Sequence, residues 1–297
     1  MTKPPAPTAP FQRRPQSWYK RVTAALHAPQ GGIPAARAEP RRVDCGPFIL
    51  SFLRPLAAYG EGMDPPGPDR VSLDAGAFTG MNLNGWRSNH QTIELAVSNW
   101  IYHLPRWHSS RIYPVPHPPY AVITAYWQLE HVKHGIQLKP NDVTLLEDYL
   151  RHDYIAYMES EGGPNWQVRD EAYKGKTIGG DPLPQYQIDD ILAAHLKTPP
   201  LDYEPLTCNG MHWLRYLWDP MQGMPNTLNY TTTLLPDVLL TACFNIVRMN
   251  SEPWEDWWEL FLEDCEILVK TIACQRQELP GADAASGSQC VADGQLS

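Results

Sequence analysis

The sequence lacks the local motifs of the common enzyme classes. It contains no G-x-S-x-G nucleophile elbow, no Walker phosphate-binding loop, no G-x-G-x-x-G dinucleotide loop and no H-E-x-x-H zinc motif. Each of these patterns places a nucleophile, a phosphate-binding backbone or two metal ligands at a fixed spacing, so the corresponding reactions have no local support. We therefore expect a non-enzymatic protein without a catalytic residue, a cofactor or a bound metal.

Long apolar runs are also missing. No stretch approaches the roughly 18 to 20 consecutive apolar residues that span a bilayer, and the start of the sequence carries no apolar segment of the kind found in secretory signals. We expect a cytoplasmic protein with no membrane span.

The six cysteines include no C-x-x-C pair and are widely spaced. Most of them stand among apolar residues, which suits small buried thiols in a reducing compartment better than a disulfide framework. Cys45 precedes the turn at Gly46-Pro47, where a nucleophile would be well placed, but no sequence feature supplies a partner histidine. We favour a buried thiol.

Proline and tryptophan, in contrast, are abundant. The 297 residues include 30 prolines and 11 tryptophans, and 43% of them are hydrophobic, which is enough for a substantial core. Because proline interrupts helices and central strands, we expect short elements joined by rigid turns.

Charge is divided unevenly along the chain. Residues 1–43 hold eight basic residues and one acidic residue, a net charge of +7, whereas the whole chain carries −9, so the remainder carries −16. An acidic body does not suit nucleic acid, whose phosphates require a cationic surface, but it does suit a basic protein partner. We expect a disordered basic arm over residues 1–43, a globular domain over 44–280, and a disordered tail over 281–297.

Hydrophobic patterns within the domain mix strands and helices. Apolar spacing predicts a helix over 141–160, capped by Asn141 or Asp142, and a shorter helix over 187–196. β-Branched and aromatic residues predict strands at 92–97, 212–218, 229–233 and 238–247, and we expect folded structure to begin near Asp44, ahead of the apolar run 48–53. Because strands and helices do not alternate regularly, we expect an α+β fold with a mixed or antiparallel sheet and packed helices.

Two segments are less clearly assigned. Residues 120–132 are compatible with either a strand or a helix, because β-branched residues come first and helix-tolerant residues follow. Residues 161–186 are rich in glycine and proline and predict a long polar connection, where the domain would divide if it contains two subdomains.

The most informative segment is a predicted helix over residues 251–272. Its apolar side chains recur at steps of three and four and form one stripe: Trp254, Trp257, Trp258, Phe261, Cys265, Leu268 and Ile272. Its acidic side chains lie on the other side and meet no basic residue before Lys270: Glu252, Glu255, Asp256, Glu259, Glu263, Asp264 and Glu266. Solvent or a cationic partner must relieve their mutual repulsion.

The two sides of this helix call for different interpretations. We expect the aromatic stripe to anchor the helix to a sheet made by the preceding strands. Seven acids exceed what solubility requires, so we predict that they form a docking face for a cationic partner. The predicted partner-binding residues are Glu255, Asp256, Glu259 and Glu263, together with Trp254 or Trp258 if either is exposed.

Histidine pairs offer an alternative. His131 and His134 would share one face of a helix and could supply two metal ligands, with Glu130 adjacent. No third ligand is specified, however, and Lys133 lies between them. We therefore favour no metal at this pair.

A second group of histidines lies in an aromatic, proline-rich stretch. His103, His108 and His117 could line a pocket, but packing of their rings against proline is the simpler interpretation. An enzyme such as a hydrolase would need scattered residues to meet in a cleft within hydrogen-bond reach. The candidates are His103, His108, His131 and Asp153.

The run Tyr230-Thr-Thr-Thr-Leu-Leu-Pro-Asp-Val-Leu-Leu-Thr-Ala-Cys-Phe244, with the later tryptophan-rich helix, resembles the C-terminal segment of immunity and accessory proteins encoded beside bacterial type VI secretion effectors. Those segments often carry a Tyr, a Pro-Leu pair, a Leu and a Phe in a strand-turn-strand ending. Here Thr233 stands at the expected proline and Leu235 at a position where a small hydroxyl residue is common. The resemblance covers less than a fifth of the chain.

The resemblance implies a protein that binds one toxic effector and occludes its active site or membrane-facing surface. We therefore predict an immunity protein that binds a cognate, basic toxin. The alternatives are an effector-loading adaptor, a hydrolase with a histidine-containing site, and a structural protein of a phage or mobile element.

Overall fold

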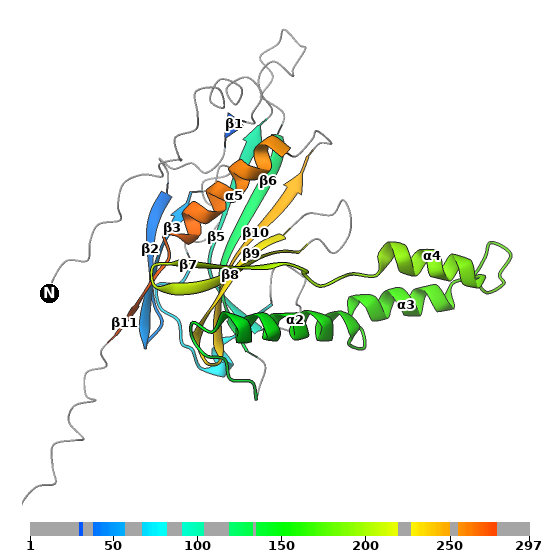
Figure 1. The fold of residues 1–297 in the computed structure, drawn as a ribbon, viewed down its shortest axis with the longest axis horizontal. Coiled ribbons are helices and arrows are strands. Elements are labelled where there is room, and N and C mark those ends of the chain that lie inside the picture. Colours follow the sequence, from blue (N-terminus) through cyan, green and yellow to red (C-terminus); the bar gives the residue numbers. More distant parts are fainter. Residues whose placement is uncertain are drawn as a thin grey trace, which may run out of the picture.

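The computed structural model describes residues 30–31, 38–56, 67–81, 91–103, 119–132, 135–218, 227–249 and 255–277. Within these residues the chain forms two antiparallel β-sheets and several α-helices, which confirms the predicted α+β fold. Figure 1 shows the larger sheet at the centre, the smaller sheet beside it, and two helices that extend away from both.

The larger sheet has the strand order β1-β5-β6-β10-β9-β8-β7, and β4 pairs with β5. The β7–β8 hairpin closes through Asn209 and Gly210, which both have positive φ as a two-residue turn requires. The strands are β1 (Gln30–Gly31), β4 (Gly80–Met81), β5 (Gln91–His103), β6 (Pro119–His131), β7 (Tyr203–Cys208), β8 (Met211–Trp218), β9 (Thr227–Leu235) and β10 (Val238–Arg248). The ambiguous segment 120–132 is therefore a strand.

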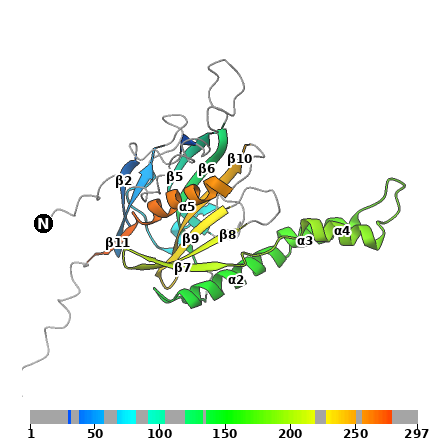
Figure 2. The ribbon, with the colours of Figure 1, turned by 45° about the horizontal axis from the view of Figure 1, so that its top comes forward.

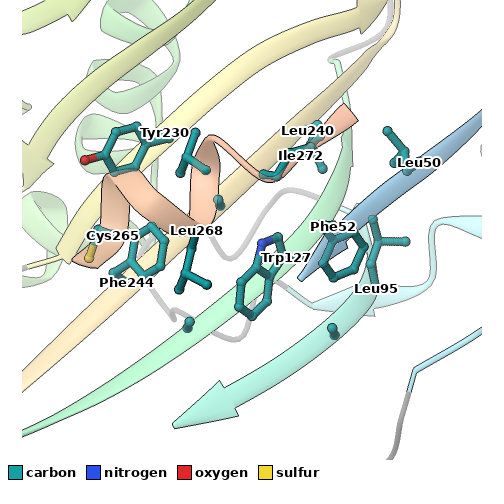
Figure 3. Packing of buried hydrophobic residues seen from close by; sticks show 14 of the residues in the cluster. Leu50, Phe52, Leu95, Trp127, Tyr230, Leu240, Phe244, Cys265, Leu268 and Ile272 are labelled. Carbon is teal, nitrogen blue, oxygen red and sulfur yellow. The ribbon is translucent and has the colours of Figure 1, made fainter. Parts of the chain in front are cut away.

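The smaller sheet has the order β11-β3-β2 and consists of β2 (Ala38–Asp44), β3 (Phe48–Pro55) and β11 (Ala273–Arg276). It shares a core with the larger sheet, because Phe52 of β3 stacks on Trp127 of β6 with ring centroids 5.6 Å apart. Figure 3 shows this contact. A short 3-10 helix, η2 (Ala75–Ala77), lies between the first strands and β4.

The expectation of short elements is wrong, since β5 and β6 each contain 13 residues. Proline is compatible with these strands because it stands where it removes no central hydrogen bond. Pro119 begins β6 and Pro55 ends β3, while Pro40 and Pro205 lie in the edge strands β2 and β7.

The two faces of the larger sheet are covered by different helices. Side chains on one face, including Trp100, Trp127 and Phe244, pack with the smaller sheet and with helix α5 (Glu255–Val269). Alternate residues of β8 point to the other face, where Tyr216 and Trp218 pack with helix α2 (Val143–Glu159). The chain therefore has one continuous sheet between two apolar layers.

Helix α2 confirms the helix predicted over 141–160. The side chain of Asp142 accepts a hydrogen bond from the backbone N–H of Leu145 at 3.0 Å, so Asp142 rather than Asn141 is the N-cap. Its buried face carries Leu146, Leu150 and Tyr154, which follow one another at helical spacing.

The prediction of a polar connection over 161–186 is wrong. This segment contains helix α3 (Pro164–Lys174), which begins with Pro164 at its first turn and is followed by α4 (Gln185–His195). Strands from both sides of the segment join the same larger sheet, so the chain does not divide there. Figures 1 and 2 show α3 and α4 side by side, projecting away from the sheet. We call residues 161–197 the helical hairpin.

The predicted boundary of the basic arm is also wrong. Residues 38–43 belong to β2, and Gln30–Gly31 form β1, although all of them fall within the predicted arm of 1–43. Val43 is fully buried and Arg41 pairs with Asp69, which explains how a basic, proline-containing segment becomes an edge strand. The rest of that arm and the predicted tail of 281–297 lie outside the described residues.

Candidate functional site

Helix α5 lies across the larger sheet, as its aromatic and aliphatic stripe predicts. Phe261, Cys265 and Leu268 are fully buried, and Ile272 continues the same line beyond the helix. Figure 3 shows Cys265 and Leu268 close to Tyr230 and Phe244 of the sheet. Burial raises the pKa of the Cys265 thiol well above its usual range, so this thiol is a packing group.

Two of the seven acids already have partners within the fold, which corrects the predicted acidic face. Asp264 is only 2% exposed and accepts a hydrogen bond of 2.7 Å from the hydroxyl of Tyr102 in β5. Burial, followed by the charge of Asp264, raises the pKa of Tyr102, so Tyr102 remains a donor. Asp264 therefore anchors the helix to the sheet.

Glu266 is the second exception. It accepts a hydrogen bond of 2.7 Å from Arg215 of β8 and another of 2.8 Å from Lys270. Arg215 also pairs with Glu204 of β7. No basic residue precedes Lys270 within the helix, but the fold brings Arg215 to Glu266 from a strand 51 residues earlier in the chain, so part of the repulsion is relieved inside the protein.

Two of the remaining acids have described side chains. Glu259 is exposed and Glu263 is half-buried, and neither forms an ion pair within the part of the chain that the structure describes. Glu255 and Asp256 begin α5, but their side chains lie outside the described residues, as does Trp254. An acidic first turn suits the positive end of the helix dipole.

Trp258 forms the wall of a cleft and is half-buried. Its ring centroid lies 5.2 Å from that of Phe261. The cleft has a volume of about 360 Å³ and opens between α5, the strands β7 to β9, and the segment that enters β7. We call it the α5 cleft, and it is lined by Thr198, Pro199, Pro200, Leu201, Asp202, Glu204, Arg215, Tyr216, Leu217, Leu228, Trp258 and Leu262.

Two acids of α5, Glu259 and Glu263, lie next to the part of the helix that lines this cleft. At about 100° per residue, Glu259 and Glu263 lie about 100° and 140° around the helix from Trp258, in the direction away from the buried Phe261. Leu262 and Glu266 lie between Trp258 and Glu259 on the helix surface. Leu262 lines the cleft, and Glu266 pairs with the lining residue Arg215. The cleft therefore adjoins the acidic surface.

Two of the histidines proposed for an enzyme site, His103 and His131, lie far apart among the described residues. His103 at the end of β5 pairs with Pro119, whereas His131 lies at the other end of β6. Twelve residues of extended strand separate these ends by about 40 Å. Asp153 is buried on α2, and His108, His117 and His134 lie outside the described residues.

His131 has a structural environment. Its Nδ1 lies 2.7 Å from the carbonyl oxygen of Val132, its Nε2 lies 4.0 Å from Asp237, and its ring packs edge-on against Phe78. Among the described residues, no group of three or more His, Cys, Asp or Glu side chains is arranged to hold a metal ion.

Cys45 is buried and unsuited to nucleophilic chemistry. Burial raises its pKa to about 12, so the thiol stays protonated at neutral pH. Five cysteines fall within the described residues and all of them are free thiols, as predicted from their spacing: Cys45, Cys208, Cys243, Cys265 and Cys274.

Comparisons with protein-family models, with curated proteins and with solved structures gave no match. Function must therefore be inferred from the site itself. The described helices include none that is long and apolar enough to cross a membrane.

Proposed function

We propose that this chain is a non-enzymatic binding protein that recognises a cationic protein through α5, and that it acts as an immunity protein against a toxin. One observation carries the proposal. Glu259 and Glu263 stand together on one side of α5 without ion-pair partners in the described chain, beside a cleft walled by Trp258. We call Glu255, Asp256, Glu259 and Glu263 the α5 acidic face.

Several carboxylates at and near α5 already have partners within the protein. Glu204 and Glu266 flank Arg215, and Asp264 is buried beneath Tyr102, so these acids contribute to the fold. Glu259 and Glu263 have no such role within the described chain, and their charge is free to attract a cation. Complementary charge of this kind speeds association and suppresses wrong partners.

A toxin is a suitable class of partner on chemical grounds. Enzymes that act on nucleic acids, and proteins that act on anionic membranes, need a cationic surface. An acidic protein that covers this surface blocks access to the target without any chemistry of its own. The weak resemblance of residues 230–244 to type VI secretion immunity proteins is consistent with this role.

The test uses charge reversal that leaves the first turn of α5 intact. In E259K/E263K two acids become basic, and the full-length tagged protein is purified from its native host together with bound proteins. The control D148K/E161K makes the same change of charge at two exposed acids of α2 and the following turn. We expect one stoichiometric partner with wild type and with the control, and loss of that partner with E259K/E263K.

The partner is then expressed alone and with this chain in bacteria. If this chain is an immunity protein, growth should stop when the partner is expressed alone. Growth should recover with wild type, but not with E259K/E263K. If it is an effector-loading adaptor, it should bind the partner without restoring growth. Purification of homo-oligomers without a partner would favour a structural protein. Equal capture by all variants would contradict the proposed role of the α5 acidic face.

A further inference from the structure

We infer that the α5 cleft receives one large apolar side chain of the partner, and that this side chain is flanked by Lys or Arg. The inference rests on the proposed recognition of a cationic partner by α5 and adds what that partner presents. The proposed function requires only the charge of Glu259 and Glu263, whereas the inference requires that the α5 cleft be occupied.

The size and lining of the cleft favour a side chain over a larger ligand. Its volume of about 360 Å³ is at the lower end of the range for small-molecule sites, which span about 300 to 1,000 Å³. Trp258 and Leu262 form one wall, while Leu217 and Leu228 come from the sheet. Apolar walls of this kind gain most from an aromatic or long aliphatic side chain that leaves water.

The charges at the cleft favour basic residues on either side of the inserted side chain. Arg215, the cation in the lining, is already shared by Glu204 and Glu266, so it has little attraction left for an anion. Asp202 is exposed at the rim and has no ion-pair partner among the described residues. Glu259 and Glu263 lie on the adjoining surface of α5, so carboxylates without ion-pair partners in the described chain stand near a cleft with apolar walls, and this arrangement fits a basic segment.

The rim opposite α5 is held in place before binding. The indole N–H of Trp218 donates to the carbonyl oxygen of Thr198 at 3.0 Å, and Arg151 donates to the carbonyl oxygen of Leu201 at 2.9 Å. The Arg151 guanidinium also lies 4.5 Å from the ring centroid of Tyr203. A wall fixed by backbone contacts loses little conformational freedom on binding, which favours affinity.

Leu201 provides a further indication. It is 70% exposed although it belongs to this fixed rim, so its side chain offers apolar surface to a bound segment. A leucine at the rim and a tryptophan at the wall would enclose one inserted side chain from two directions. This matches the arrangement of interface hot spots, where a buried anchor is surrounded by groups that exclude water.

The experiment measures binding of a synthetic peptide, acetyl-Lys-Lys-Trp-Lys-Lys-amide, by fluorescence anisotropy and by amide chemical shifts at low salt. Two companion peptides replace Trp by Ala or all Lys by Glu. T198W is designed to fill the cleft from its rim, because the Thr198 side chain is exposed and, among the described residues, the hydrogen bond at Thr198 is made by its carbonyl oxygen. T198S is the matched control, and far-ultraviolet circular dichroism establishes that each variant is folded.

We expect saturable binding of the Lys-Trp-Lys peptide, and about tenfold or greater weakening when Trp becomes Ala or when T198W fills the cleft. T198S should bind like wild type, and the Glu peptide should not bind. Saturation without dependence on Trp or on T198W, but with loss in E259K/E263K, would overturn the inference and leave the proposed function standing. No binding at about 1 mM peptide would also overturn the inference, while partner capture would still test the proposed function.

Discussion

The sheet body and the helical hairpin use their aromatic residues in opposite ways. The body buries Trp100, Trp127, Trp213 and Trp218 almost completely. The hairpin exposes 60% of Tyr173 and 64% of Tyr186, and the buried residues of α3 and α4 are Asn165, Ala172 and Ile188. The body therefore derives its stability from packing, whereas the hairpin depends on contacts at its base.

The largest expected difference in stability between the body and the hairpin comes from replacing a tryptophan in each. Trp127 stacks on Phe52 and contacts Phe244 edge-on, so W127A should lower the free energy of unfolding by about 3–5 kcal/mol. Trp166 on α3 is 39% exposed, and W166A should cost about 1 kcal/mol or less. Urea unfolding followed by circular dichroism measures both. Similar losses would contradict the division between body and hairpin.

The next effect concerns the base of the hairpin. Asn165 is buried, donates to Glu159 at 2.8 Å and to the carbonyl oxygen of Lys197 at 3.0 Å, and accepts from the Lys197 N–H at 2.7 Å. N165A should reduce the local opening free energy of α3 and α4 by about 1–3 kcal/mol. Hydrogen exchange should show faster exchange in α3 and α4 and unchanged protection in β6 and β10. Equal loss of protection in the sheet would show that the hairpin and the body unfold together.

A smaller effect on the stability of the hairpin is expected from a change in pH. The hydrogen bond from Arg169, followed by that from Asn165, lowers the pKa of Glu159 below its ordinary value. A lowered folded-state pKa means that Glu159 stabilises the fold above its unfolded pKa, and that this contribution is lost as pH falls through the folded pKa. Because the pair is largely exposed, solvent screens it and the effect on stability is small.

Carbon-13 NMR of the Glu159 carboxyl measures this effect directly. The titration midpoint should lie below about 4.3, the usual value for glutamate, and R169Q should move it upward. An unchanged midpoint in R169Q would show that Arg169 does not hold the charge of Glu159.

The same contrast explains what the sequence predicts and what it does not. Helices α2 and α5 have regular apolar spacing, because each buries one face against a core. Strands β8, β9 and β10 are rich in β-branched and aromatic residues, because both faces of the larger sheet are covered. Helix α3 buries little of its own surface, so residues 164–174 show no apolar stripe and were expected to be a polar connection. Strand β2 shows a similar lack of signal, since only Val43 is fully buried there.

The candidate site also has features that the sequence predicts and features that it does not. The position of Glu259 and Glu263 away from the buried stripe of α5 follows from helical spacing and could be predicted. The pairing of Arg215 with Glu266 and the bond from Tyr102 to Asp264 could not, because they join residues 51 and 162 positions apart. The α5 cleft has no local signal either, since its walls come from the segments 198–228 and 258–262.

The most direct test of the central claim is the affinity of the captured partner for wild type, E259K/E263K and D148K/E161K at several salt concentrations. We predict that E259K/E263K weakens binding about tenfold or more at low salt and flattens its dependence on salt, because the attraction at α5 is lost. D148K/E161K should bind like wild type. If E259K/E263K binds as tightly as wild type at low salt, recognition does not occur through the acidic side of α5, and the account is wrong.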